Sequence, residues 1–260
     1  MNEKEQLEMK NQYCPVQMES TNFQNFELIY EGIKKKGLYL LEYYDSYLKD
    51  AFVTQVAELF IKNGTDALFI QEEQTQYSLR DIFLSRTLFK QNPQDFPSIS
   101  QITQESVALL NPPFEETFDN FEQRVTIISA KSKCPLDYID SLYQAVRENS
   151  QIKLVIIDSH TDYYYKTNIV PQLSRMSFNE NIIILFTSQI SAEKFIDKSI
   201  FLPSFLKNSL YLHSKHPDLY TLADSKGIVY EFELDIRTPS NKRLKSHFTL
   251  RPASAYCQEG

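Results

Sequence analysis

Short apolar segments that alternate with amphipathic ones constrain the fold of this chain more than any other feature. Five of them lie at residues 37–43, 66–71, 125–129, 154–158 and 181–188. Most are nearly continuously apolar, as in the fourth, which is written KLVIIDSH with its flanking residues. Strands that are apolar on both faces belong to a mainly parallel sheet with helices on both sides. The pattern therefore predicts an α/β fold.

The segments between these strands predict the covering helices. Apolar residues recur at helical spacing over residues 47–62. The sequence Ser78-Leu-Arg-Asp81 is typical of a capping box, and the helix that it begins is expected to run to about residue 89. Pro135 is expected in the first turn of a third helix, and a fourth is expected around residues 164–176.

After about residue 200 the pattern changes to strands joined by turns. Residues 209–213, 228–234 and 247–250 are the expected strands, and residues 225–227 form a hairpin turn. A parallel α/β core followed by an antiparallel extension is the order of elements in a RecA-like domain.

The 260 residues are enough for one α/β domain with a sizeable core. Residues 1–30 are polar and without periodicity, so they are expected to form a flexible lead-in. Residues 31–260 then make a single RecA-like domain. Within it, residues 91–122 hold four of the eleven prolines and are expected to be a surface insertion.

Composition limits the partners and the compartment. The net charge of −7 gives no global attraction to nucleic acid or to an anionic membrane, so any RNA contact needs a local patch. The three cysteines are too scattered for a disulfide framework or a zinc site, which favours a reducing compartment. No apolar run approaches the length that crosses a bilayer. We expect a soluble protein, cytoplasmic and possibly also nuclear, without a membrane partner.

A RecA-type nucleotide site requires a glycine loop ending in Lys-Ser/Thr after the first strand and an acid at the end of a later strand. Asp158 in KLVIIDSH matches the acid. The turn after the first strand, YYDSYLKD, has no glycine, a bulky Tyr47 and two acids, so phosphate would meet side chains and negative charge. The spaced pair Gly32 and Gly37 precedes the strand instead. Asp158 is therefore predicted to be structural, with no catalytic residue, metal or cofactor in this chain.

Local clusters of positive charge are the candidate nucleic-acid contacts, because phosphate recognition needs them. The candidates are Lys194 and Lys198 after the fifth strand, and Arg237, Lys242, Arg243 and Lys245 near the C-terminus, in a basic span that extends to Arg251. The alternative is that both groups are solvated surface. His213 and His216 have no third ligand nearby, so they do not predict a zinc site.

Several segments together resemble the sixth subunit of the Elongator complex. At the start these are GLYLLEY without a phosphate loop and IKNGTDALFIQEEQTQYSLRDIF, and in the middle VTIIS, DSLYQAVREN, LVIIDS and IIILFTS. At the end they are DKSIFLPSFLKNSLYL, DLYTLADSKGIVYEFEL and KSHFTLRPASAYCQEG. The resemblance covers most of residues 37–260 and lies in order and spacing. The insertion and the lead-in have no clear counterpart.

That resemblance implies a heterohexameric ring with two copies each of the fourth, fifth and sixth Elongator subunits, all RecA-like. It also implies docking on the catalytic Elongator subunits, tRNA binding, and support of wobble-uridine modification whose chemistry belongs to another subunit. Tyrosine and phenylalanine supply 16 and 18 residues, and aromatic residues are favoured at protein interfaces.

Two other functions stay open. The sheet also resembles recombinase paralogues of homologous recombination, some of which lack the glycine loop. An active nucleotide hydrolase is the third hypothesis, and it would need Asp158 to hold magnesium.

Overall fold

The computed structural model describes residues 36–43, 45–71, 77–129, 136–158, 169–189, 208–214, 226–237 and 243–259. In these residues nine strands form one sheet in the order β3-β2-β4-β5-β1-β6-β7-β8-β9. The parallel strands are β1 (Gly37–Tyr43), β2 (Asp66–Gln71), β3 (Val125–Ser129), β4 (Ile152–Asp158), β5 (Ile183–Gln189) and β6 (Asn208–Ser214). The antiparallel strands are β7 (Tyr230–Arg237), β8 (Arg243–Arg251) and β9 (Tyr256–Glu259).

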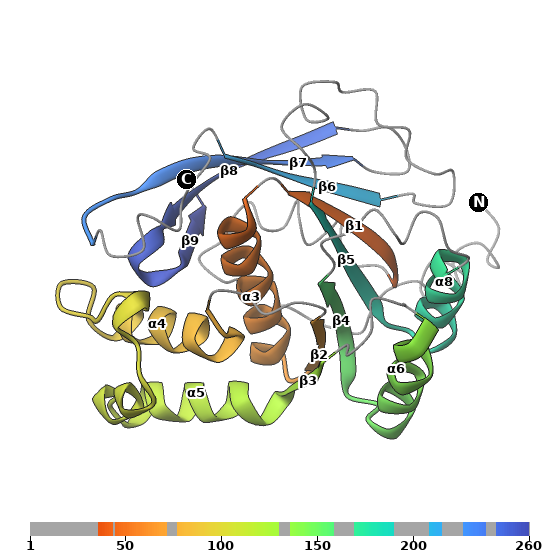
Figure 1. Ribbon diagram of the computed structural model, residues 1–260, viewed down its shortest axis with the longest axis horizontal. Coiled ribbons are helices and arrows are strands. Elements are labelled where there is room, and N and C mark those ends of the chain that lie inside the picture. Colours follow the sequence, from red (N-terminus) through yellow and green to blue (C-terminus); the bar gives the residue numbers. More distant parts are fainter. Residues whose placement is uncertain are drawn as a thin grey trace, which may run out of the picture.

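Helices cover both faces of the parallel part (Figure 1). They are α3 (Ser46–Lys62), α4 (Leu79–Gln91), α5 (Pro112–Arg124), α6 (Leu136–Glu148) and α8 (Ile169–Asn179), with short 3-10 turns η1 (Ile99–Gln101), η2 (Gln104–Leu109) and η4 (Pro252–Ser254). The predicted α/β fold with an antiparallel extension is confirmed. Strand β6 differs from the prediction, because it pairs parallel with β1 and only its other edge is antiparallel.

Two separate cores explain why the central strands are apolar on both faces. In β1, Tyr39, Leu41 and Tyr43 belong to the core under α3, whereas Leu38 and Leu40 belong to the core under α6 and α8. Strands β4 and β5 alternate in the same way. Since successive side chains of a strand point to opposite faces, each strand needs apolar residues at every position to fill both cores.

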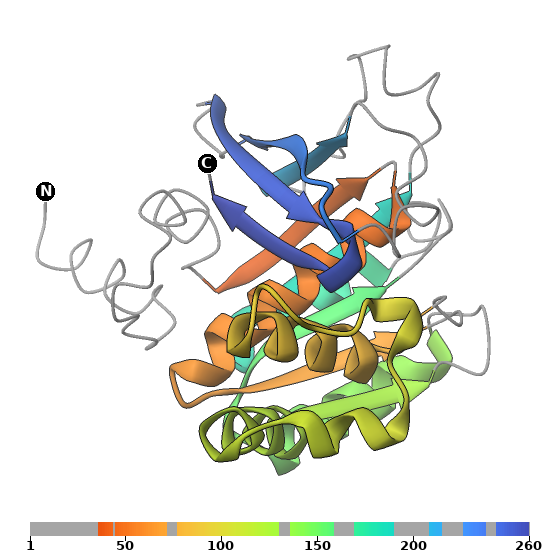
Figure 2. The ribbon, with the colours of Figure 1, turned by 90° about the vertical axis from the view of Figure 1, so that its left-hand side faces the viewer.

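Helix α3 is buried on nearly all sides, from Tyr47 to Ile61. It lies between the sheet, the helices α4 and α5, and the C-terminal strands, as the turned view shows (Figure 2). A helix in such a position is expected to be apolar all round. Its polar residues Lys49, Asp50 and Glu58 are nevertheless buried, so each needs a partner within the protein.

Residues 91–122 are mostly exposed and are anchored by a few buried side chains. In α5, Phe118 and Phe121 are buried against Phe83 of α4, with ring centroids 6.1 and 3.6 Å from that of Phe83. The capping of α4 is as predicted, because the Asp81 amide donates to the Ser78 hydroxyl at 3.1 Å. The predicted lead-in, residues 1–30, lies outside the described residues. Within the described part of the chain, no helix has the length and apolar character needed to cross a membrane.

The last residues close the fold over α3 and α4. Residues 252–255, here called the C-terminal turn, are buried and connect β8 to β9. The hydroxyl of Tyr47 in α3 donates to the Pro252 carbonyl, and Arg86 in α4 donates to the Ala255 carbonyl at 2.7 Å. The C-terminal turn is therefore tied to both helices.

Candidate functional site

The candidate site lies where the parallel strands β4, β5 and β1 end side by side and α3 begins. In open α/β sheets, ligands bind outside the carboxyl ends of the strands. Asp158 is the last residue of β4, as predicted, and is buried. Residues Asp158, Thr187 and Tyr43 lie on the same side of the sheet as α3, because each is an even number of positions from a residue of the core under that helix.

Lys49 of α3 is the centre of the site. Its ammonium group donates to both carboxylate oxygens of Asp158, at 2.8 and 2.7 Å, and lies 2.6 Å from a carboxylate oxygen of Asp50. The hydroxyl of Thr187 donates to Asp158 Oδ1 at 2.8 Å. The Lys49 ammonium also lies 5.4 Å from the centroid of the Tyr43 ring. One buried cation therefore joins two buried carboxylates.

The electrostatics keep Lys49 charged. Burial by itself lowers the pKa of a lysine, but the carboxylates of Asp50 and Asp158 outweigh burial and raise the pKa of Lys49 above its ordinary value. Burial raises the pKa of Tyr43 well above its ordinary range, so this phenol stays neutral. At neutral pH the site thus contains one ammonium group and the two carboxylates that contact it.

The N-terminus of α3, where a phosphate would be expected, is occupied by the chain itself. Asp45 is the N-cap, and its carboxylate accepts a hydrogen bond of 2.7 Å from the Leu48 amide. Free amides at a helix N-terminus are what a phosphate-binding loop offers to an anion. Tyr47, two residues after the cap, is completely buried, and its hydroxyl donates to a carbonyl of the C-terminal turn.

A small pocket lies beside Asp158. Polar side chains of Asp50, Thr54, Gln71 and Asp158 line it together with apolar residues of α3, α4, β2 and β4. It has room for about one water molecule. No group of histidine, cysteine or acidic residues in the described ranges is arranged to hold a metal ion.

Lys49 lies between the two acids of YYDSYLKD and was not among the residues predicted from the sequence. The signal is visible when Gly-x4-Gly-Lys-Ser/Thr is placed on residues 43–50. Lys49 then falls at the lysine of the pattern and Asp50 at its Ser/Thr, while Tyr43 and Leu48 replace the glycines. The lysine of a phosphate loop is present, but it contacts the acid of β4.

A magnesium nucleotide does not fit these side chains as they lie. The position of the magnesium-binding hydroxyl is a carboxylate, Asp50, and the strand-end acid is already neutralised by Lys49. Asp45 adds a second carboxylate at the helix N-terminus. Bound phosphates would add negative charge beside these acids.

Of the other predicted residues, Lys194, Lys198 and Lys242 lie outside the described residues. Arg237 and Arg243 are paired opposite each other where β7 ends and β8 begins, and Lys245 is opposite Asp235. The C-terminal basic span thus has an acid beside it in the sheet, although none interrupts it in the sequence.

The fold is RecA-like, and side chains of the chain itself fill the space at the carboxyl ends of its parallel strands. No protein-family model matches the sequence, and no curated protein matches it. Two solved structures are similar in fold. The first is described as an ATPase domain, and it has a TM-score of 0.62 and 14% identity, with the match covering 98% of this chain and 94% of that domain.

The second structure is that of a DnaB-like replicative helicase, described with its interactions with primase. It has a TM-score of 0.64 and 13% identity, and the match covers 98% of this chain and 66% of the helicase. At these identities the likeness shows the RecA-like fold, which confirms the predicted fold class. It does not extend to the activity of either protein.

Proposed function

We propose that this chain is a non-catalytic RecA-like subunit of the Elongator accessory ring, where it supports tRNA binding and wobble-uridine modification. The single observation that carries the non-catalytic part is the buried Lys49 ammonium, which contacts the carboxylates of both Asp50 and Asp158. A lysine held in this way is not free for phosphate, and an acid neutralised in this way is not free for magnesium.

The energetic argument favours a permanent structural role for these ions. Lys49 has no exposed side-chain surface, and Asp158 exposes 7% of its side chain. Removing one partner of a buried ion pair costs about 3–5 kcal/mol, because the other charge is left uncompensated. Nucleotide binding would have to offset a cost of this order before it gained anything.

The ring and its partners rest on the family resemblance together with the fold. The partners in this proposal are two other RecA-like subunits, the fourth and fifth of Elongator, along with the catalytic Elongator subunits. Transfer RNA is bound through the assembly. The covalent chemistry on the uridine belongs to another subunit, so this chain contributes shape and contact surface.

Affinity purification of the tagged full chain tests the ring. Two other RecA-like proteins are expected to co-purify in equal amounts, with a hexamer in native mass spectrometry. A chain recovered only as a monomer would contradict the proposal. A fluorescent ATP analogue tests the site separately, with no saturable binding expected for the purified chain. Tight binding that Asp158→Ala abolishes would instead support a nucleotide hydrolase.

An accessory role in homologous recombination is the second candidate. The observation that favours it is that one structure of similar fold is a replicative helicase, a protein that acts on DNA. This function predicts that a recombinase co-purifies and that deletion causes sensitivity to DNA damage. Loss of wobble-uridine modification on deletion, without such sensitivity, would decide for the tRNA role.

A further inference from the structure

Cations and aromatic rings alternate on a surface where α4 ends and the C-terminal strands return. We call this surface the cation–aromatic patch. It consists of Phe89, Lys90, Phe96, Lys226, Arg251 and Tyr256. These residues come from four separate stretches of the chain, so the patch exists only in the folded protein.

Each cation of the patch lies over a ring. The Lys226 ammonium is 5.2 Å from the Phe96 centroid, and the Arg251 guanidinium is 5.6 Å from that of Phe89. Phe89 in turn lies 5.1 Å from Phe96 and 5.0 Å from Tyr256. Rings that hold long side chains in place reduce the entropy lost when those side chains bind an anion.

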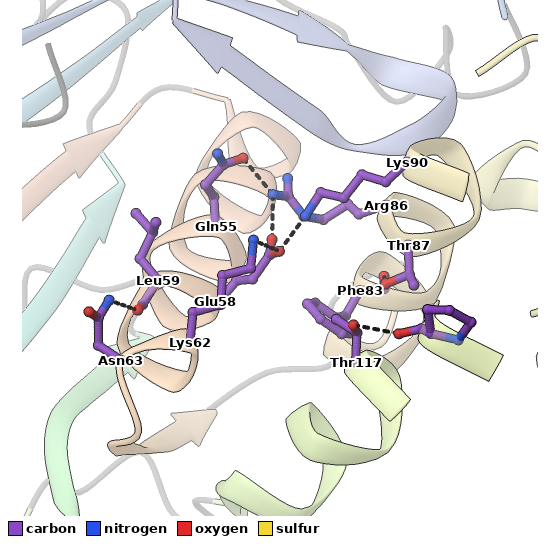
Figure 3. Close-up of polar contacts among 11 residues, drawn as sticks. Gln55, Glu58, Leu59, Lys62, Asn63, Phe83, Arg86, Thr87, Lys90 and Thr117 are labelled. Atoms are coloured by element: carbon purple, nitrogen blue, oxygen red, sulfur yellow. Dashed lines mark hydrogen bonds and ion pairs between the residues drawn. The ribbon is translucent and has the colours of Figure 1, made fainter. Parts of the chain in front are cut away.

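Lys90 of the patch also belongs to a buried ion cluster between α3 and α4, which includes Gln55, Glu58 and Arg86 (Figure 3). Arg86 is fully buried, donates to Gln55 and Glu58 of α3, and lies 5.4 Å from the Tyr256 centroid. Lys90 also donates to Glu58, and Arg86 donates to the C-terminal turn just before Tyr256. The ring of Tyr256 is therefore positioned by contacts with α4 on one side and by its own strand on the other.

The surface charge of the patch is positive in a chain of net charge −7. Glu58 is buried and makes ion pairs with Arg86, Lys62 and Lys90. Its single negative charge is therefore already compensated and does not offset the positive charge of the patch. Asp95, one residue before Phe96, is exposed, and so is Glu231, five residues after Lys226. The patch itself contains three cations, Lys90, Lys226 and Arg251, and no acid.

We propose that the cation–aromatic patch binds single-stranded polynucleotide. Its cations contact phosphates, and unpaired bases pack beside the half-buried rings of Phe89 and Tyr256 and on the guanidinium plane of Arg251, which lies over Phe89. A groove of positive charge with aromatic rings beside it is how proteins bind single strands without reading their sequence. Base stacking favours this ligand over an acidic protein segment, which would use the cations alone.

This surface shares Arg251 with the basic C-terminal span predicted from the sequence and is otherwise separate from that span. Arg243 and Arg251 begin and end the strand β8, whose length separates them by roughly 27 Å. The proposal adds a contact surface to the proposed tRNA role. It is tested on the isolated full chain, so that a failure to find ring partners would leave it standing.

The experiment measures binding of fluorescein-labelled oligouridine RNA to the full chain by anisotropy over a series of salt concentrations. The variant Lys226→Glu/Arg251→Glu is expected to bind at least tenfold more weakly. Its salt slope should fall by about 1.4, since each phosphate contact on a single strand contributes about 0.7. The charge-matched control Arg147→Glu/Lys153→Glu, on α6 and β4, should bind like the wild type.

A second variant separates stacking from charge. Tyr256→Leu keeps an apolar side chain and all the surface cations, and it is expected to weaken RNA binding at least fivefold while binding of polyglutamate stays unchanged. Circular dichroism checks that each variant is folded. Equal weakening by the patch and control variants would overturn the proposal. So would wild-type binding of polyglutamate as tight as that of RNA, which would indicate a protein partner.

Discussion

Replacing Lys49 with methionine tests the candidate site most directly. Methionine keeps the volume of the side chain but removes the cation that joins Asp50 and Asp158. Both carboxylates expose only 7% of their side chains, so water cannot replace the ammonium fully. We expect the free energy of unfolding to fall by about 3–5 kcal/mol, the usual cost of breaking a buried ion pair. For a domain of this size the corresponding fall in Tm is roughly 6–20 °C.

Urea denaturation at pH 7, followed by circular dichroism, measures the change. Lys62→Met is the matched control, because Lys62 is on the same helix and also contacts a carboxylate, at 3.2 Å from Glu58. Its side chain is 50% exposed, so a loss of no more than about 0.5 kcal/mol is expected. Adding Asp158→Asn to Lys49→Met should recover part of the loss, since it removes one of the uncompensated charges.

Equal effects of the two lysine substitutions would refute this reasoning. A loss below about 1 kcal/mol for Lys49→Met would mean that water reaches the carboxylates, as it does around exposed pairs. The site would then be open enough for an external ligand, and the non-catalytic proposal would lose its main support.

Three further predictions concern the ties between α3, α4 and the C-terminal turn. Arg86→Met should destabilise the fold by about 3–5 kcal/mol by leaving Glu58 with weaker compensation, and limited proteolysis should then cut the C-terminal strands faster. Tyr47→Phe should cost about 1–3 kcal/mol in urea denaturation, because a buried carbonyl of the C-terminal turn loses its donor. Burial, together with the charges of Arg86 and Lys62, lowers the pKa of Lys90 to about 8, although Glu58 opposes this shift. Acetic anhydride at pH 8.5 should therefore acetylate Lys90 faster than Lys62, as measured by mass spectrometry. Because the folded pKa of Lys90 is below its unfolded value, the unfolded chain binds more protons between the two, and the Lys90 contribution to stability should rise with pH in that window.

These predictions would fail in different ways. Wild-type stability and proteolysis of Arg86→Met would mean that the ion cluster under the C-terminal strands is dispensable. A Tyr47→Phe variant as stable as the wild type would show that the hydrogen bond of this hydroxyl makes no net contribution to the free energy of unfolding. Labelling of Lys90 no faster than that of Lys62 would show that its ammonium group remains protonated at pH 8.5.

The sequence by itself determined the layered fold and the place of Asp158. The continuous apolar runs of the central strands supply both cores with side chains, and such runs are visible in the sequence without knowledge of the fold. The scarcity of glycine after the first strand also argued against a phosphate loop, and the structure has Asp45 and Tyr47 at that position.

Only the tertiary structure decided what Asp158 contacts and where the surface cations gather. Lys49 and Asp158 are 109 residues apart, and their contact requires the pairing of β4 and β5 beside β1 together with the packing of α3 on that face. The cation–aromatic patch likewise combines residues from α4, the loop after it and the C-terminal strands. Spacing along the chain carries no information about such contacts, because they depend on how distant elements pack.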